Sequence, residues 1–194
     1  MKSKINFKYI ILVAIAITAI FVFQVRFAVN NNLNQVQIGG PFALLDVDGA
    51  KVTEQDLLGK YSIVFFGFTN CPMICPTGVN NMSHAALSLS DKQRKKVNFV
   101  FITLDPERDN MAILKDYFAN FYKDFIALTG DLTAIRNAAD NYKVYFRKSF
   151  MDDENYMIDH SSYIYLMDKK GRYLDHFDYD TPAATIKKEL LKHL

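Results

Sequence analysis

The chain contains two cysteines, Cys71 and Cys75, which are separated by three residues. They follow an apolar run at residues 62–68 that indicates a buried strand, and the adjacent Pro76 is typical of the first turn of a helix. A strand that leads into a helix would place both thiols at the helix N-terminus, where unpaired backbone N–H groups favour thiolate over thiol. The C-x-x-x-C spacing favours metal chelation over the thiol–disulfide exchange that is typical of C-x-x-C pairs.

A structural disulfide explains this pair poorly, because a bond between Cys71 and Cys75 would close a very short loop. Such a loop removes little conformational entropy from the unfolded chain, so the bond would add little stability. Thiol–disulfide exchange stays open as an alternative, since a redox disulfide can form across the loop. Two thiolates alone satisfy few metals, and the metal interpretation therefore needs a third ligand.

His160 is the candidate for this third ligand. It follows an acidic segment at residues 147–159 and stands just before an apolar run at 162–167 that indicates a strand. In the order of strands that we expect, the chain passes the N-terminus of the cysteine helix at this point. Two soft thiolates and one imidazole suit Cu(I), and a fourth donor would also allow Cu(II).

The other three histidines fit a metal site less well. His84 lies nine residues after Cys75 on the same predicted helix, which corresponds to roughly 13 Å along the axis. His176 falls in the last predicted strand, and His193 lies in the C-terminal tail. We therefore expect none of the three to bind the metal.

Residues 7–25 form an apolar run that, as a helix, would span roughly 29 Å, the thickness of the hydrocarbon core of a bilayer. Lys2, Lys4 and Lys8 lie before or at the start of the run and only Arg26 follows it closely, which predicts a cytoplasmic N-terminus and an exported remainder. A cleaved signal peptide is the alternative, but the run is long for an h-region and no A-x-A site follows it. We predict an uncleaved transmembrane anchor at 1–26, a polar tether at 27–38 and one domain at 39–194.

The charge of the chain is unevenly distributed. Lys2, Lys4, Lys8 and Arg26 are the charged residues before Asp46, and removing these four positive charges from the net charge of +2 leaves −2 on the rest. A mildly acidic domain lacks the basic face that nucleic-acid binding requires. An exported domain also lies where thiols oxidise unless they are kept reduced.

Hydrophobic periodicity and turn residues divide residues 39–194 into strands and helices. Strands are expected at 42–52 (a hairpin that turns at Asp48 and Gly49), 61–68, 97–104, 142–146, 162–167 and 172–177, with a short bridging segment at 125–129. Helices are expected at 76–90, 110–122, 131–141 and 181–194, and a surface loop at 147–159. Parallel βαβ followed by antiparallel ββα is the order of the thioredoxin-like α/β fold, a central mixed sheet flanked by helices.

Four motifs occur in the order seen in the Sco/SenC family, and the chain resembles that family from about residue 39 onward. They are FGFTNCP followed by CP at 66–76, LDPERD at 104–109, LTG at 128–130 and IDHS at 158–161. The resemblance implies a thioredoxin-fold copper chaperone for cytochrome c oxidase. It further implies that Cys71, Cys75 and His160 are the copper ligands.

The same resemblance implies a partner, subunit II of cytochrome c oxidase, whose binuclear copper site is filled or whose cysteines are kept reduced. Together with the predicted anchor, it places the chain in the bacterial inner membrane with its main domain in the periplasm. The mitochondrial inner membrane is less favoured, because no transit peptide is apparent. We expect a metallochaperone rather than a turnover enzyme.

The chain departs from the family at Met73, where relatives usually carry an aspartate after the first Cys-Pro. Methionine in place of aspartate removes a hard oxygen donor beside the thiolates. We therefore expect it to affect Cu(II) binding and partner docking more than Cu(I) binding. We expect Met73 to pack the loop, with a weak thioether contact as the alternative. The segment 105–109 fits either a docking element or a structural turn in which Asp109 caps the next helix.

Two enzyme classes compete with the chaperone interpretation. The first is a membrane-tethered thiol–disulfide reductase that uses Cys71 and Cys75. His160 discriminates between the two functions, because a copper site needs it and a dithiol reductase does not. The second is a peroxidase, but Thr69 lies one residue too close to Cys71 to match the peroxiredoxin loop.

Overall fold

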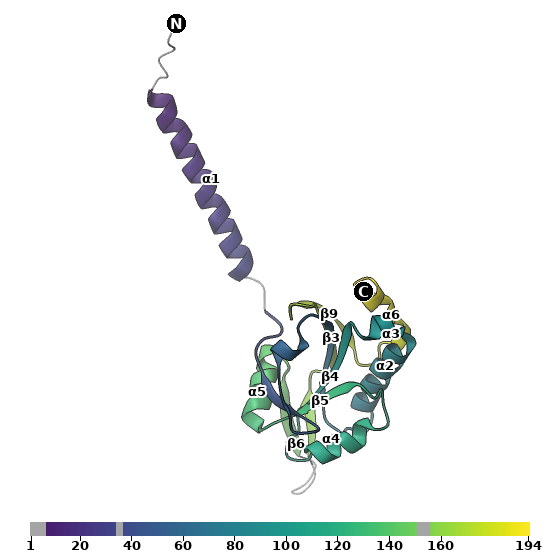
Figure 1. The fold of residues 1–194 in the computed structure, drawn as a ribbon. Coiled ribbons are helices and arrows are strands. Elements are labelled where there is room, and N and C mark those ends of the chain that lie inside the picture. The colour runs from purple at the N-terminus through teal and green to yellow at the C-terminus, as the bar shows by residue number, and fades with distance from the viewer. Residues whose placement is uncertain (1–6, 34–36, 151–155) are drawn as a thin grey trace. The chain divides into compact units, whose positions relative to one another are not determined.

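The computed structural model describes residues 7–33, 37–150 and 156–194 (Figure 1). The chain divides into two compact units, Met1–Val36 and Gln37–Leu194. In the first unit, helix α1 spans Phe7–Leu33 and so continues past the boundary expected between anchor and tether at residue 26. Within the described residues, no helix combines the length and the apolar character needed to cross a membrane. The membrane anchor therefore stays a prediction.

A mixed β-sheet forms the centre of the second unit. Its strands are β1 (Ala43–Asp46), β2 (Lys51–Thr53), β3 (Tyr61–Gly67), β4 (Val97–Thr103), β5 (Phe125–Thr129), β8 (Tyr163–Met167) and β9 (Tyr173–Asp178). They are arranged in the order β2-β1-β5-β4-β3-β8-β9. β3, β4 and β5 run parallel, and the remaining neighbours pair antiparallel. The expected α/β fold with a mixed sheet is confirmed, and the bridging segment at 125–129 is a full strand.

Helices cover both faces of this sheet (Figure 1). They are η1 (Glu54–Leu57), α2 (Ile74–Ser88), α3 (Asp91–Arg94), α4 (Met111–Phe118), α5 (Leu132–Asn141) and α6 (Ala183–Leu191). α2 packs beside α6 on one face, and α5 lies on the other (Figure 1). α2 begins at Ile74, two residues before the expected start at Pro76.

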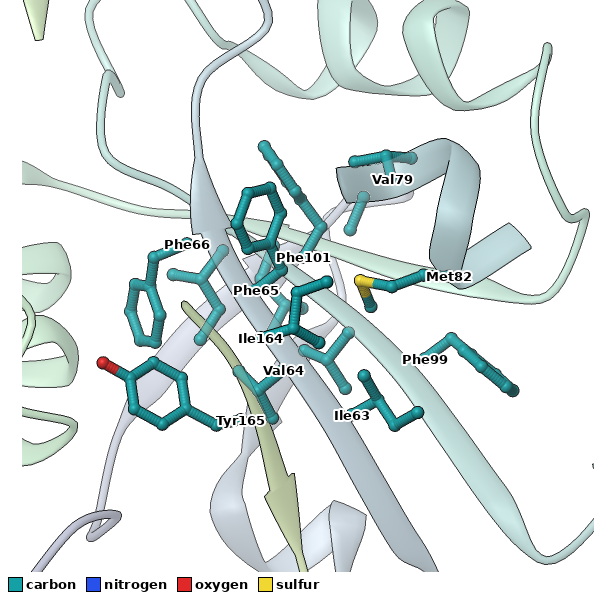
Figure 2. Close-up of a cluster of buried hydrophobic side chains, with 14 of the residues drawn as sticks. Ile63, Val64, Phe65, Phe66, Val79, Met82, Phe99, Phe101, Ile164 and Tyr165 are labelled. Atoms are coloured by element: carbon teal, nitrogen blue, oxygen red, sulfur yellow. The ribbon is translucent and has the colours of Figure 1, made fainter. Parts of the chain in front are cut away.

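The core is built on β3 and β4, where every residue except Tyr61 is buried. Successive side chains of a strand point to opposite faces of the sheet. Phe65 accordingly faces α2, where a Cβ on Gly78 would lie 3.1 Å from its ring. Phe66 faces the other way, and its ring centre lies 5.2 Å from that of Tyr142. Figure 2 shows this cluster around the central strands, which are buried on both faces as parallel strands require.

The segment that we expected to be a surface loop contains a second, two-stranded sheet. β6 (Phe146–Phe150) pairs antiparallel with β7 (Tyr156–His160), and residues 151–155 between them lie outside the described residues. The expected strand at 142–146 is also wrong. Lys143 has a φ of 59°, a left-handed turn that ends α5 and delays the next strand until residue 146. We call β6 and β7 together the ribbon.

Candidate metal centre

The two cysteines lie where β3 gives way to α2, as the sequence predicted. Both are free thiols, and both are largely buried, with exposed fractions of 9% for Cys71 and 0% for Cys75. Gly67, the last residue of β3, makes room for the second thiol. A Cβ on Gly67 would lie 2.8 Å from the Cys75 sulfur, closer than real Cβ contacts allow.

The two thiols differ strongly in acidity. A hydrogen bond from the Cys75 thiol, assisted by the backbone N–H groups at the start of α2, lowers the pKa of Cys71 to about 5. One of those groups, the Cys75 N–H, lies 3.4 Å from the Cys71 sulfur. The same thiol–thiol bond, together with burial, raises the pKa of Cys75. Cys71 is therefore a thiolate at neutral pH, and Cys75 holds the shared proton.

His160 is the last residue of β7, and it reaches the cysteines as expected. Its Nε2 lies 3.7 Å from the Cys75 sulfur. Its Nδ1 lies 2.8 Å from the carbonyl oxygen of Ser161. A carbonyl oxygen only accepts hydrogen bonds, so Nδ1 carries the ring proton and Nε2 presents a lone pair to Cys75. Metal-binding histidines are typically oriented by a hydrogen bond of this kind.

The two thiols and the imidazole are ligands that suit one soft metal ion, but they are not yet arranged to bind it. Within the described residues, no three His, Cys, Asp or Glu side chains are already grouped so that they could hold a metal ion. The distance of 3.7 Å between the Cys75 sulfur and His160 Nε2 is nevertheless suitable for two donors that bind one ion. With metal–sulfur and metal–nitrogen bonds of about 2.3 and 2.0 Å, two donors at a trigonal angle lie roughly 3.7 Å apart. Cys71, the hydrogen-bond partner of Cys75, is then the third candidate donor.

Asp109 anchors the loop that carries the cysteines, a role that the sequence analysis missed. Its fully buried carboxylate accepts hydrogen bonds from the backbone N–H of Thr69 at 2.9 Å and from the hydroxyls of Thr69 and Thr103. Burial raises the pKa of Asp109. The helix-cap role that we considered for Asp109 is wrong, because Asn110 caps α4 by accepting from the N–H of Ile113.

The segment 105–109 also fastens the ribbon. Arg108 forms an ion pair with the buried Asp105, and its Nη1 donates to the carbonyl oxygen of Tyr156 at 3.0 Å. The Arg108 guanidinium stacks on the Tyr156 ring at 3.7 Å, and the Tyr156 hydroxyl donates to Asp105 at 2.8 Å. Because Tyr156 begins the strand that ends in His160, these contacts hold the third candidate ligand in place.

A cavity of about 380 Å³ opens beside the candidate ligands. Cys71 and His160 line it, together with Phe68, Ile158 and two methionines, Met73 and Met157. Met73 is 66% exposed, so it does not pack the loop.

The remaining histidines lie away from the cysteines. His84 is exposed on α2. His176 on β9 contacts the Tyr173 hydroxyl at 2.6 Å, and His193 lies 3.6 Å from Glu189. That none of the three binds the metal stays a prediction.

The SCO1/SenC family model matches residues 30–194. The chain belongs to the SCO1/SenC family. Among related SCO1/SenC sequences, the SCO2-like protein RP587 of Rickettsia prowazekii is 43% identical over 162 residues, which cover 82% of this chain and 78% of the relative. The identification confirms the family resemblance that the four motifs carry.

Solved SCO1/SenC structures share the fold. ScoI of Bradyrhizobium japonicum, solved with copper bound, superposes with a TM-score of 0.76 at 38% identity, over 81% of this chain and 99% of that one. A more distant relative is BsSco, a member of the Sco family of cytochrome c oxidase assembly proteins in which a disulfide switch has been identified. It is 25% identical with a TM-score of 0.66, over 81% of this chain and 94% of that one.

Proposed function

We propose that this chain binds copper through Cys71, Cys75 and His160 and acts as an assembly factor for cytochrome c oxidase. The observation that carries the proposal is the approach of His160 Nε2 to the Cys75 sulfur, with Nδ1 held as the protonated nitrogen. Two sulfur donors and one imidazole favour the soft ion Cu(I). Bound copper in ScoI and membership of BsSco in an assembly family support the same function.

The chain's own residues prepare the site before metal arrives. The helix N-terminus and the Cys75 thiol keep Cys71 deprotonated, so a cation can bind it without first displacing a proton. Cys75 loses its proton only when it coordinates. The Asp109 carboxylate already accepts hydrogen bonds from two threonines, so we do not count it among the copper ligands. Cu(II) would therefore need a fourth donor besides the two cysteines and the histidine.

The partner in this proposal is subunit II of cytochrome c oxidase, which would receive the copper of its binuclear site. A carrier must release its cargo, and a site of three donors leaves the ion open to ligand exchange with the partner's own thiolates. The protein is then a metallochaperone, and copper is its cargo.

The experiment that tests copper binding uses the reduced full-length chain. We expect one Cu(I) ion per chain, with an X-ray absorption spectrum that contains both sulfur and imidazole nitrogen. Cys71→Ser and Cys75→Ser should each abolish tight binding. Retention of full Cu(I) binding by either variant would contradict the proposed ligand set.

A second candidate function is favoured by the contact between the two free thiols and by the low pKa of Cys71. In a thiol–disulfide reductase, the Cys71 thiolate would attack a disulfide of subunit II, and Cys75 would then resolve the mixed disulfide. Two electrons and the Cys75 proton pass to the partner, and solvent supplies the second proton of its reduced cysteine pair. Reduction of an oxidised subunit II domain by the His160→Ala variant, at the wild-type rate and without copper, would favour this function.

We also propose that residues 1–26 anchor the protein in the bacterial inner membrane, with the domain in the periplasm. The apolar run at 7–25 and the three lysines before and at its start support this placement. In spheroplasts, a membrane-impermeant thiol reagent should label the reduced cysteines without lysis of the inner membrane. Labelling that requires lysis would contradict it.

A further inference from the structure

Met73 breaks two local rules of protein structure. It occupies the N-cap of α2 but makes no side-chain cap hydrogen bond, although Ser, Thr, Asp and Asn are the residues that stabilise this position through such a bond. It also exposes 66% of an apolar side chain. A residue that gives up both capping and burial without a structural gain points to a functional role.

The exposure of the sulfur-containing residues falls steeply along the segment from Met73 to the cysteines. The exposed fraction is 66% for Met73, 9% for Cys71 and 0% for Cys75. All three lie on one short segment between β3 and the first turn of α2. An ion that arrives from solvent or from a donor protein can therefore contact the Met73 thioether before it reaches the cysteines.

A second methionine lines the same cavity. Met157 belongs to β7, three residues before His160, and both Met73 and Met157 line the cavity of about 380 Å³ that also contains Cys71. The carboxylate on this lining, Asp159, lies 3.3 Å from Arg147 in an ion pair. The cavity is therefore lined by two methionines beside Cys71, against a mostly apolar wall.

Thioethers are weak, soft and uncharged ligands, so they accept Cu(I) but hold hard cations poorly. We propose that Met73 and Met157 form an entry site for Cu(I), which takes the ion from a donor and passes it to Cys71. The transfer is a ligand exchange in which copper stays Cu(I) and no electron moves. The entry site rests on the proposed copper function of the neighbouring residues.

The direct test removes the cysteines and follows the methionines. In the full-length Cys71→Ser/Cys75→Ser chain, Ag(I) serves as a redox-inert substitute for Cu(I), and ¹³C-methyl NMR reports each methionine. The Met73 and Met157 methyl signals, assigned with Met73→Leu and Met157→Leu, should shift on titration with Ag(I). The Met111 signal should not move, because Met111 is exposed on α4 but does not line the cavity. Unshifted Met73 and Met157 signals would overturn the entry site.

A kinetic test keeps the cysteines. Cu(I) transfer from a chelator to the full-length chain should be severalfold slower for Met73→Leu, which keeps the size of the side chain but removes the donor. The final stoichiometry should be unchanged, and Met111→Leu should load at the wild-type rate. Equal loading rates for Met73→Leu and wild type would also contradict the proposal. Failure of wild type to bind Cu(I) at all would instead contradict the proposed function. The NMR titration with Ag(I) would still test the entry site in that case.

Discussion

The guanidinium of Arg108 donates a hydrogen bond of 3.0 Å to the main-chain carbonyl of Tyr156, and it stacks on the ring of the same residue at 3.7 Å. Arg108 belongs to the segment that also supplies Asp109, the anchor of the cysteine loop. Tyr156 begins the strand that ends in His160. One short segment therefore braces both halves of the candidate metal centre.

Replacing Arg108 by Ala should loosen the ribbon. The change removes the hydrogen bond to Tyr156 and the partner of the buried Asp105 carboxylate, so we expect a loss of about 2 kcal/mol in the free energy of unfolding. Urea denaturation measures this loss, and hydrogen exchange of the β7 amides should become faster. Arg147→Ala is the control, because its exposed pair with Asp159 is worth only about 0.5 kcal/mol. Equal effects of the two variants would contradict the bracing role.

Replacing Gly67 by Ala should displace the Cys75 thiol. The new Cβ would lie 2.8 Å from the sulfur and 3.0 Å from the Phe101 ring, and such overpacking typically costs about 1–3 kcal/mol. We expect reduced stability in urea denaturation and weaker Cu(I) binding in competition with a chelator. Gly78→Ala is the matched control, since its Cβ would crowd Phe65 and not a thiol. Normal Cu(I) affinity in the Gly67→Ala chain would show that the thiol does not need this space.

The reactivity of Cys71 should depend on pH in an unusual range. With its pKa lowered to about 5, Cys71 is a thiolate across neutral pH, so its alkylation rate should rise around pH 5 and level off above it. The ordinary thiol would show the same rise only near pH 8.5. Cys75→Ala removes the hydrogen-bond donor and should move the midpoint upward. Mass spectrometry after timed iodoacetamide treatment measures the alkylation rate of Cys71 in wild type and in Cys75→Ala. A wild-type midpoint near the pKa of an ordinary thiol would refute the thiolate assignment.

Local patterns in the sequence were sufficient to predict the cysteine site. A buried strand, two cysteines and a helix start are neighbours in the chain, and the Cys75 thiol and helix N–H groups that lower the pKa of Cys71 follow from that order. The place of His160 followed from the expected fold, because the strand after it pairs with β3 in a thioredoxin-like sheet.

Contacts between distant residues were not predictable in the same way. Charged residues hide the alternation of the ribbon strands, and β6 and β7 pair with each other rather than with the central sheet, so the segment resembled a loop. Asp109 looked like a helix cap because Asn110 and α4 follow it. Its actual partner, Thr69, lies 40 residues away, and no local pattern indicates a hydrogen bond between them.

The affinity of the reduced full-length chain for Cu(I), measured by competition with a chelator for wild type, His160→Ala and His84→Ala, tests the central claim most directly. Because His160 Nε2 faces the Cys75 sulfur whereas His84 is exposed elsewhere on α2, we expect His160→Ala to weaken binding by at least about tenfold. His84→Ala should bind as wild type does. Equal affinities for wild type and His160→Ala would contradict the three-ligand site and favour a dithiol reductase.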